Sequence, residues 1–112
     1  MDFPQKVEVW QVDLHGAKGH EQKKERPAAV WKDLDHVKMA IVLPITETID
    51  REKFAYTYRI APGCKNGLKE ESIVLIFQMR AIGKERFIKK LGELEEGDIK
   101  LIAEILRDML KL

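Results

Sequence analysis

Two short stretches of the chain carry residues that could act on a phosphodiester. The first is a charged segment, Gly19-His20-Glu21-Gln22-Lys23-Lys24-Glu25-Arg26-Pro27, which leads into an apolar run. The second, Pro44-Ile45-Thr46, closes the next apolar run. A proline restrains the residue before it to extended backbone, so Arg26 should stand at the start of a strand. An arginine fork and a hydroxyl, each at the end of a strand, suit recognition and cleavage of a phosphodiester.

Cleavage of RNA by its own 2′-hydroxyl needs three kinds of group. A base takes the hydroxyl proton, an acid protonates the leaving 5′-oxygen, and cations or donors hold the extra negative charge on phosphorus. The planar guanidinium of Arg26 matches two phosphate oxygens at once. The Thr46 hydroxyl can donate to a phosphate oxygen or relay a proton, and Glu21 and His20 are the conventional acid–base candidates.

Each of these residues also has an ordinary structural interpretation. An arginine at a strand start is usually a surface ion-pairing residue, and a threonine after Pro-Ile is usually a strand-end residue or a cap. A lone loop histidine such as His20 is most often solvated. Residue types alone therefore make only a weak case for a nuclease.

Other kinds of site find less support. His15 and His20 lie four residues apart, but no second cluster supplies ligands at a metal-binding spacing, so we expect neither a metal nor a cofactor. Gly16 and Gly19 do not form a phosphate-cradling loop. Cys64 is the only cysteine, which excludes an internal disulfide, and it has no obvious base partner.

The composition predicts one globular domain spanning 1–112 with a modest core. Apolar residues make up 45% of the chain and charged residues 35%, but the formal net charge is only +1. Any nucleic-acid interface must therefore come from local segregation of charge, and basic residues do gather in 15–26 and 84–90. We expect a cytoplasmic protein, because no apolar run approaches a membrane span and no signal-peptide core is present.

Apolar patterning predicts a series of short strands over 7–14, 27–31, 37–43, 54–60, 72–82 and 88–91. In the first, the adjoining Val9 and Trp10 indicate a bulge or a strand buried on both faces. The run 72–82 is the most apolar and fits a central strand, and Pro44 should close the third. Between strands we expect a polar loop over 15–26, a charged loop over 47–53, turns at 33–36 and 62–67, and a helical turn at 84–87.

Near the C-terminus the apolar period becomes that of an amphipathic helix, over 99–110, with Asp98 as the expected N-cap. Leu101, Ile105 and Leu112 widen the apolar stripe, so we expect one side to pack on the sheet and the other to contact a second copy of the chain. A helix tucked deeply into its own domain is the alternative. Short strands followed by one helix predict a mainly β (α+β) fold, a strongly curved antiparallel sheet or partly open barrel.

Four stretches, taken in order, resemble the MazF/PemK (Kid) family of toxin–antitoxin mRNA interferases. The opening strand of that family is similar to Glu8-Val9-Trp10-Gln11-Val12-Asp13-Leu14, and its loop and second strand to Gly19-His20-Glu21-Gln22 with Arg26-Pro27-Ala28. The strand that carries the family threonine resembles Val42-Leu43-Pro44-Ile45-Thr46. A later strand resembles Ser72-Ile73-Val74-Leu75 followed by Gln78-Met79-Arg80. The resemblance covers almost the whole chain.

The resemblance implies an SH3-like barrel that forms a homodimer and binds RNA along the dimer interface. It implies metal-independent, sequence-specific cleavage of single-stranded RNA, leaving a 2′,3′-cyclic phosphate and a 5′-hydroxyl, and a cognate antitoxin that holds the toxin inactive. Carried over residue by residue, Arg26 and Thr46 would be the catalytic pair, with Glu21 and His20 beside them. We expect RNA contacts from a further set: Gln22, Lys23, Lys24, Gln78 and Arg80.

Four positions depart from the family pattern: Lys24, Glu47, Phe77 and Ala81. Phe77 stands where many members have an aspartate that transfers a proton, so a mechanism through that aspartate cannot run here unchanged. Glu47 adds negative charge near the expected RNA groove. Two rival functions therefore stay open, namely a non-cleaving protein that binds RNA or an antitoxin, and a gyrase poison like the fold-related CcdB toxins.

Overall fold

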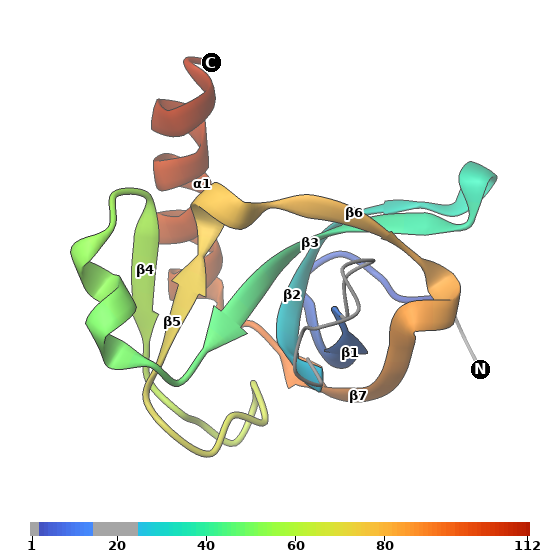
Figure 1. The fold of residues 1–112 in the computed structure, drawn as a ribbon, viewed down its shortest axis with the longest axis horizontal. Helices are drawn as coiled ribbons and strands as arrows, with labels where there is room; N and C mark the ends of the chain where they lie inside the picture. Colours follow the sequence, from blue (N-terminus) through green and yellow to red (C-terminus); the bar gives the residue numbers. More distant parts are fainter. Residues whose placement is uncertain (1–2, 15–24) are drawn as a thin grey trace, which may run out of the picture.

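The computed structural model describes residues 3–14 and 25–112, which form seven strands and one α-helix joined by short 3₁₀ helices (Figure 1). The strands are β1 (Glu8–Asp13), β2 (Glu25–Leu34), β3 (Met39–Thr46), β4 (Thr57–Ile60), β5 (Ser72–Leu75), β6 (Arg80–Gly83) and β7 (Phe87–Glu93). The helix is α1 (Glu96–Leu110).

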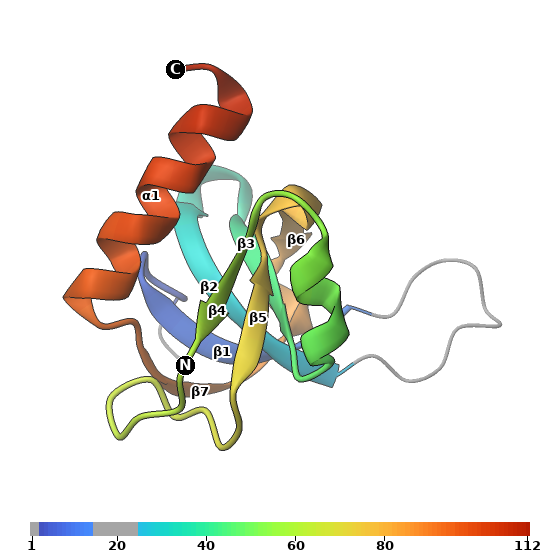
Figure 2. The same ribbon diagram turned by 90° about the vertical axis from the view of Figure 1, so that its left-hand side faces the viewer.

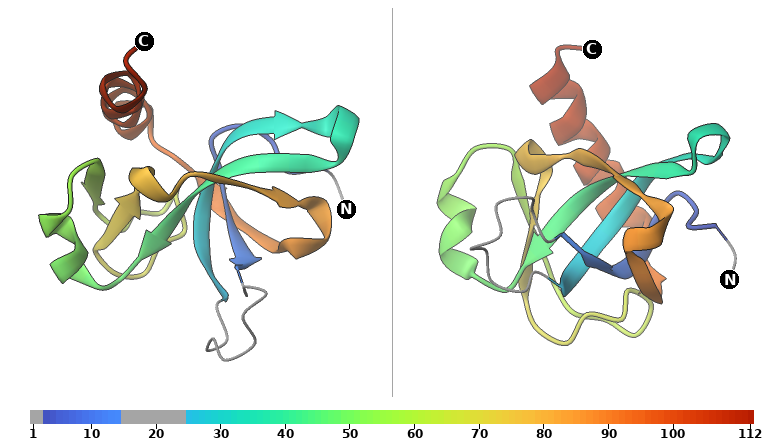
Figure 3. Two further views of the ribbon diagram at one scale, coloured as in Figure 1. Left: turned by 45° about the horizontal axis from the view of Figure 1, so that its top comes forward. Right: turned by 45° about the vertical axis from the view of Figure 1, so that its right-hand side comes forward.

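All strand pairs are antiparallel, and β3 lies at the centre of the sheet. The strand order is β4-β5-β3-β2-β1-β7, and β6 pairs with the first half of β3. Figures 1 and 3 show β1, β2, β3, β6 and β7 curving around one interior, with β4 and β5 lying to one side near α1. Among the described strands no pairing joins β6 to β7, so the sheet is not closed. This confirms the predicted fold class of a curved antiparallel sheet with a C-terminal helix.

Two apolar clusters lie on opposite faces of the central strands. The cluster inside the curl includes Trp10 and Phe87, whose rings meet edge to face with centroids 5.7 Å apart. The cluster on the other face includes Ile102 and Leu106 of α1, and Figure 2 shows the helix crossing the sheet on that side. Because neighbouring residues of a strand point to opposite faces, strands buried on both faces read as continuous apolar runs.

Strand β1 is buried on both faces at the adjoining Val9 and Trp10, which confirms one of the two interpretations, whereas the bulge beside them lies in β7. Val9 belongs to the cluster under α1 and Trp10 to the cluster inside the curl, so the strand is buried on both faces. Its pairing with β7 also shifts register between these two residues, because Val9 lies opposite Gly92 and Trp10 opposite Lys90. Leu91 is therefore the extra residue of a bulge.

The prediction of one central strand over 72–82 was wrong. The run forms β5 and β6, separated by a 3₁₀ turn, Ile76–Gln78. Both strands pair with β3, but the register relative to β3 slips by three residues between them, which is the length of the turn. Ile76 stays fully buried, whereas the two residues after it are exposed at the surface of the sheet.

The ends of several other strands also differ from the prediction. Strand β2 continues beyond 31 to Leu34 because its hairpin with β3 extends past the core, and the turn falls at Asp35–Val37. Strand β3 does not end at Pro44 but runs on to Thr46. Ala28 and Pro44 are the last pair between β2 and β3, so the proline sits where β3 changes partners.

The predicted strand over 54–60 is shorter, and only Thr57–Ile60 is β4. Tyr56 has a φ of 61°, which a strand cannot accommodate. The preceding charged segment, expected to be a loop, contains a 3₁₀ helix, Ile49–Lys53. The short helical turn predicted near residue 84 is confirmed as Lys84–Arg86.

Helix α1 starts earlier than predicted, and its N-cap is Glu95 rather than Asp98. Asp98 lies in the first turn, where its carboxylate accepts a hydrogen bond from the Tyr58 hydroxyl of β4. This contact joins the helix to the far edge of the sheet. Burial and the Asp98 carboxylate together raise the pKa of Tyr58 to about 12.

The loop between β4 and β5 is built around the buried side chain of Asn66. Its amide oxygen accepts hydrogen bonds from the backbone N–H groups of Gly63 and Leu68 at 3.1 and 2.9 Å, and its amide nitrogen donates to the carbonyl of Ala61 at 3.0 Å. Gly67 follows with a φ of 73°, and a Cβ built there would lie 2.1 Å from the carbonyl oxygen of Leu91. The loop is therefore pressed against β7.

Substitution of Gly67 by alanine should destabilise the protein strongly, because both the positive φ and the backbone contact with Leu91 oppose a side chain. We expect a loss of about 2–4 kcal/mol in the free energy of unfolding, measured by urea denaturation. Gly97→Ala is the matched control, since it meets no atom within 4 Å and lies in α1. That variant should be neutral or more stable, and equal stability of the two would contradict this account.

Substitution of Tyr58 by phenylalanine should cost about 1–2 kcal/mol of stability near neutral pH, because the hydrogen bond to Asp98 is lost. The folded-state pKa of Tyr58 lies above the usual value, so its contribution is full below pH 10 and is lost as the pH rises from 10 to 12. The stability difference between wild type and Tyr58→Phe should therefore shrink over that range. A difference that stays constant up to pH 12 would contradict the prediction.

Candidate functional site

The candidate site opens where β2 and β3 separate. Beyond the last β2–β3 pair, Thr46 of β3 pairs with Ile73 of β5, whereas Arg26 of β2 pairs with Val12 of β1. The register of the preceding pairs, continued past the separation, would set Arg26 opposite Thr46. The two strands thus part at the residues that the sequence predicted as a catalytic pair, and both side chains are half-buried.

Two hollows flank this separation. The first has a volume of about 780 Å³, and its lining includes both cationic and carboxylate side chains, among them Lys69, Lys89, Glu25 and Glu47. The second has a volume of about 320 Å³. It is lined by Arg26, Thr46, Thr48, Arg51, Phe54, Leu75, Phe77 and Gln78.

Arg26, Thr46 and Thr48 line both hollows and so form a wall that the two share. The Thr46 hydroxyl oxygen accepts a hydrogen bond from the backbone N–H of Thr48 at 3.1 Å. Because that bond uses a lone pair of the oxygen, the hydroxyl proton remains available to a ligand. The wall therefore presents a guanidinium and a hydroxyl donor to both sides.

Two arginines, Arg26 and Arg51, line the second hollow. Within residues 3–14 and 25–112, neither Arg26 nor Arg51 forms an ion pair with a carboxylate. Lys53, next to Arg51, is paired with Asp50 at 3.1 Å. Unpaired guanidiniums that face a shared hollow attract an anion, and a planar fork matches two oxygens of a phosphate.

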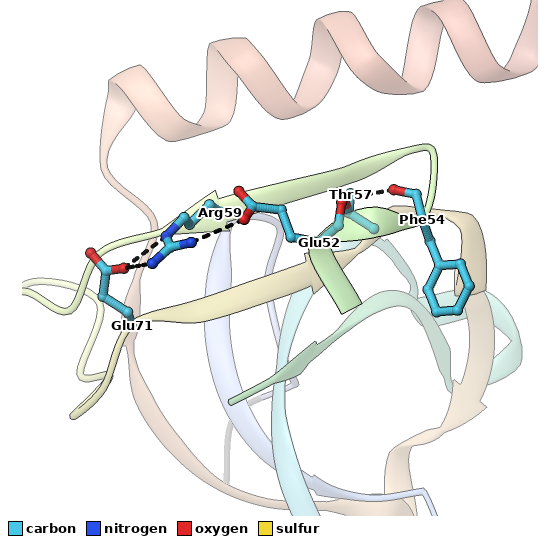
Figure 4. A network of polar contacts seen from close by, with 5 residues as sticks. All are labelled: Glu52, Phe54, Thr57, Arg59 and Glu71. Carbon is cyan, nitrogen blue, oxygen red and sulfur yellow. Dashed lines mark hydrogen bonds and ion pairs between the residues drawn. The ribbon is translucent and has the colours of Figure 1, made fainter. Parts of the chain in front are cut away.

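The 3₁₀ helix that carries Arg51 is held by a polar network (Figure 4). Arg59 of β4 donates from Nη1 to Glu52 at 2.9 Å and from Nε to Glu71 at 2.8 Å. The hydrogen bonds that Arg59 donates to Glu71 and, to a lesser extent, to Glu52 raise its pKa above the usual value. The Thr57 hydroxyl donates to the backbone carbonyl of Phe54 at 3.0 Å. The network ties one edge of the second hollow to β4.

The described residues include four of the site residues that the sequence predicted. Arg26 and Thr46 lie together as expected, and Gln78 lines the second hollow. Arg80 is exposed on β6 opposite Val42 and does not line either of these hollows. The other predicted residues lie outside the described part of the chain; they are His20, Glu21, Gln22, Lys23 and Lys24.

Sequence reasoning missed most of the second hollow. Arg51 lines it from the segment 47–53, which we expected to be a charged loop, and Phe54 lines it from the start of the strand expected over 54–60. A signal was present, because a phenylalanine follows a run of alternating charges, and basic residues interleaved with aromatic ones are typical of nucleic-acid binding. Phe77 was noted as a departure, but its exposure depends on the register slip between β5 and β6.

Two other features are absent from the described residues. Nowhere in that part of the chain do three His, Cys, Asp or Glu side chains come together as metal ligands. No helix there is long and apolar enough to cross a membrane.

The chain thus forms a curved antiparallel sheet with a C-terminal helix. Its groove bears guanidiniums and a hydroxyl, which are groups able to bind a phosphate. The family model described as PemK-like, MazF-like toxin of type II toxin-antitoxin system matches residues 5–110. The chain belongs to this family, which confirms the resemblance inferred from the sequence.

Individual relatives agree with this assignment. Endoribonuclease MazF9 of Mycobacterium tuberculosis is 27% identical to the chain, over 89% of this chain and 90% of the relative. A crystal structure of MazF from Deinococcus radiodurans is 17% identical over the full length of both chains, with a TM-score of 0.78. A MazE–MazF structure from the same organism is also 17% identical, covers 100% of this chain and 99% of that one, and has a TM-score of 0.77. Both solved structures share the fold.

Replacement of Arg59 by alanine should loosen the 3₁₀ helix, because Glu52 and Glu71 lose their common partner. We expect faster hydrogen exchange of the Arg51 and Phe54 amides, which bond to the carbonyls of Thr48 and Arg51. Arg107→Ala on the exposed side of α1 is the control and should leave both amides unchanged. Unchanged exchange in Arg59→Ala would show that the network does not hold this segment.

Proposed function

We propose that the chain is a sequence-specific endoribonuclease that cleaves single-stranded RNA without a metal ion, as the toxin of a type II toxin–antitoxin pair. The observation that carries this proposal is the wall shared by the two hollows. Arg26 and Thr46 stand on it, and no carboxylate among the described residues pairs with the arginine. A relative's name, endoribonuclease MazF9, supports the same activity.

In the proposed reaction, the 2′-oxygen of one nucleotide attacks the phosphorus on its 3′ side while the bond from phosphorus to the 5′-oxygen of the next nucleotide breaks. The products are a 2′,3′-cyclic phosphate and a 5′-hydroxyl. Arg26 donates two N–H groups to the non-bridging oxygens, and the Thr46 hydroxyl donates a third hydrogen bond. These donors hold the negative charge that develops on the phosphoryl oxygens in the transition state.

Two proton transfers complete the reaction. A base takes the proton from the attacking 2′-hydroxyl, and an acid gives one to the leaving 5′-oxygen. We assign these roles to Glu21 and His20, which precede β2 in the chain. The remaining predicted residues would contact RNA, with Gln78 acting from the second hollow.

We further propose that the chain acts as a homodimer and is held inactive by a cognate antitoxin. Apolar side chains of α1 and of the residues after it stay uncovered, with Leu101 and Leu110 each 46% exposed and Leu112 82% exposed. Exposed large apolar side chains favour burial against a partner. The MazE–MazF structure supports the presence of a protein partner for this fold. Because the proposed substrate is RNA, we expect the toxin to act in the cytoplasm.

Replacement of Arg26 by alanine should lower the rate of RNA cleavage by at least about 100-fold, because transition-state charge loses its main donor. Arg26→Lys should restore little, since an ammonium cannot form the two-point contact. The assay is incubation of purified protein with a long single-stranded RNA in the presence of a chelator, with the new ends mapped and their phosphates identified. Thr46→Ala and Thr46→Ser in the same assay separate the hydroxyl from the rest of the side chain.

Circular dichroism and thermal melting must show that each variant is folded. A folded Arg26→Ala protein that cuts at the wild-type rate would remove this role from the arginine. Cleavage by the wild type that stops when chelator is added would contradict metal independence. Binding without any cutting by the folded wild type would favour the rival function of a non-cleaving protein.

A further inference from the structure

We infer that the second hollow holds one nucleobase of the RNA, the base next to the cleaved phosphate, stacked on the Phe54–Phe77 pair. The inference rests on the proposed function, because the base belongs to the strand whose phosphate Arg26 and Thr46 bind. The cleavage reaction itself does not require a bound base, so this site is additional to the groups that act on the phosphate.

The two phenylalanine rings are exposed although a phenylalanine usually is not. Phe54 is 41% exposed and Phe77 39% exposed, and their centroids lie 5.8 Å apart with the ring planes tilted by 60°. The rings therefore pack against each other and still leave surface uncovered in a hollow. Exposed aromatic surface beside cations is the usual platform for a base of single-stranded RNA, because every base has a face that can stack.

Backbone hydrogen bonds hold the two segments that carry the rings. The backbone N–H of Phe77 donates to the carbonyl of Tyr56 at 3.2 Å, which joins the 3₁₀ turn after β5 to the residue before β4. Both backbone groups of Phe54 are hydrogen-bonded. Its N–H donates to the backbone carbonyl of Arg51 at 3.1 Å, and its carbonyl accepts a hydrogen bond from the Thr57 hydroxyl (Figure 4). The positive φ of Tyr56 is an uncommon conformation that these bonds maintain. A preorganised surface loses little entropy when it binds.

The charge around the rings fits a nucleotide better than an apolar peptide side chain. The Arg51 guanidinium lies 6.0 Å from the centroid of the Phe54 ring and has no carboxylate partner in the described part of the chain. Lys53 lies 5.7 Å from the same ring but is paired with Asp50. Among the described residues, Arg51 thus supplies a cation at the rim, beyond Arg26 on the wall, for the phosphate on the far side of the base.

The size and the polarity of the second hollow also favour a single nucleobase. A volume of about 320 Å³ is at the small end of ligand pockets, which suits one base and not a longer segment. Leu75 adds apolar surface to the lining, while the amide of Gln78 and the hydroxyl of Thr48 can hydrogen-bond to the edge of a base. The common wall with the first hollow places this base directly beside the phosphate at Arg26 and Thr46.

The test uses an oligonucleotide that spans a mapped cleavage site and carries 2′-deoxyribose at the attacking nucleotide, so that it binds without being cut. Phe77→Ala should weaken its binding by about 5- to 100-fold, the range found when a stacking aromatic is removed. Phe77→Tyr keeps a ring and should bind within about threefold of the wild type. Val37→Ala, at the tip of the β2–β3 hairpin and 61% exposed, is the control and should bind normally.

A second set of oligonucleotides, each lacking one base, tests whether the ring and a particular base act on each other. At one position next to the cleaved phosphate, loss of the base should weaken binding to the wild type but have no further effect on Phe77→Ala. The inference would be overturned if, at every position, the loss of affinity from the missing base and the loss from Phe77→Ala simply multiply. Unchanged binding by folded Phe77→Ala would also overturn it. In both of those cases the wild type would still cleave RNA, so the proposed function would stand. A folded wild type that neither binds nor cleaves RNA would overturn both.

Discussion

The exchange of pairing partners along β3 is the constraint on which the rest of the molecule depends. The first half of the strand lies between β2 and β6, whereas its last residues pair with β5. Every backbone N–H and C=O in a buried sheet needs a partner, so β2 can be released from β3 only where other strands take over. Here β1 takes Arg26 and β5 takes Thr46. The position of the groove between them is therefore set by the hydrogen-bond pattern of the sheet.

Separate segments of the chain border the groove on its different sides. The slip of three residues between β5 and β6 leaves Ile76 inside and turns Phe77 and Gln78 outward. A polar network centred on Arg59 fixes the 3₁₀ helix on the other side. On the opposite margin, the loop around Asn66 brings Gly67 and Leu68 to the first hollow while it presses on β7. The floor of the site is thus built from hydrogen-bonded segments that are far apart in sequence.

Local patterns in the sequence predicted much of this fold. Alternation and adjacency of apolar residues predicted β1 and its burial on both faces, and the three-to-four period predicted α1. The pairing of Arg26 with Thr46 at one site followed from their places at the ends of two strands that the family resemblance brings together.

What could not be predicted depends on contacts between distant segments. The split of 72–82 follows from the register of two strands on β3, and apolar composition carries no record of register. Asp98 has the residue type of a cap, but the Tyr58 hydroxyl, from a strand forty residues away in sequence, makes it a tertiary contact instead. The exposure of Phe54 likewise depends on the backbone at Tyr56 and on Arg59, not on the residues beside it.

The wall formed by Arg26, Thr46 and Thr48 also has an evolutionary consequence. It separates the first hollow from the second, which is lined by the segments around Phe54 and Phe77. Under the proposed function, mutations in those two segments would change which RNA sequence fits while the arginine and the threonine stay in place. Such an arrangement would let related toxins acquire new targets through substitutions at a few exposed positions.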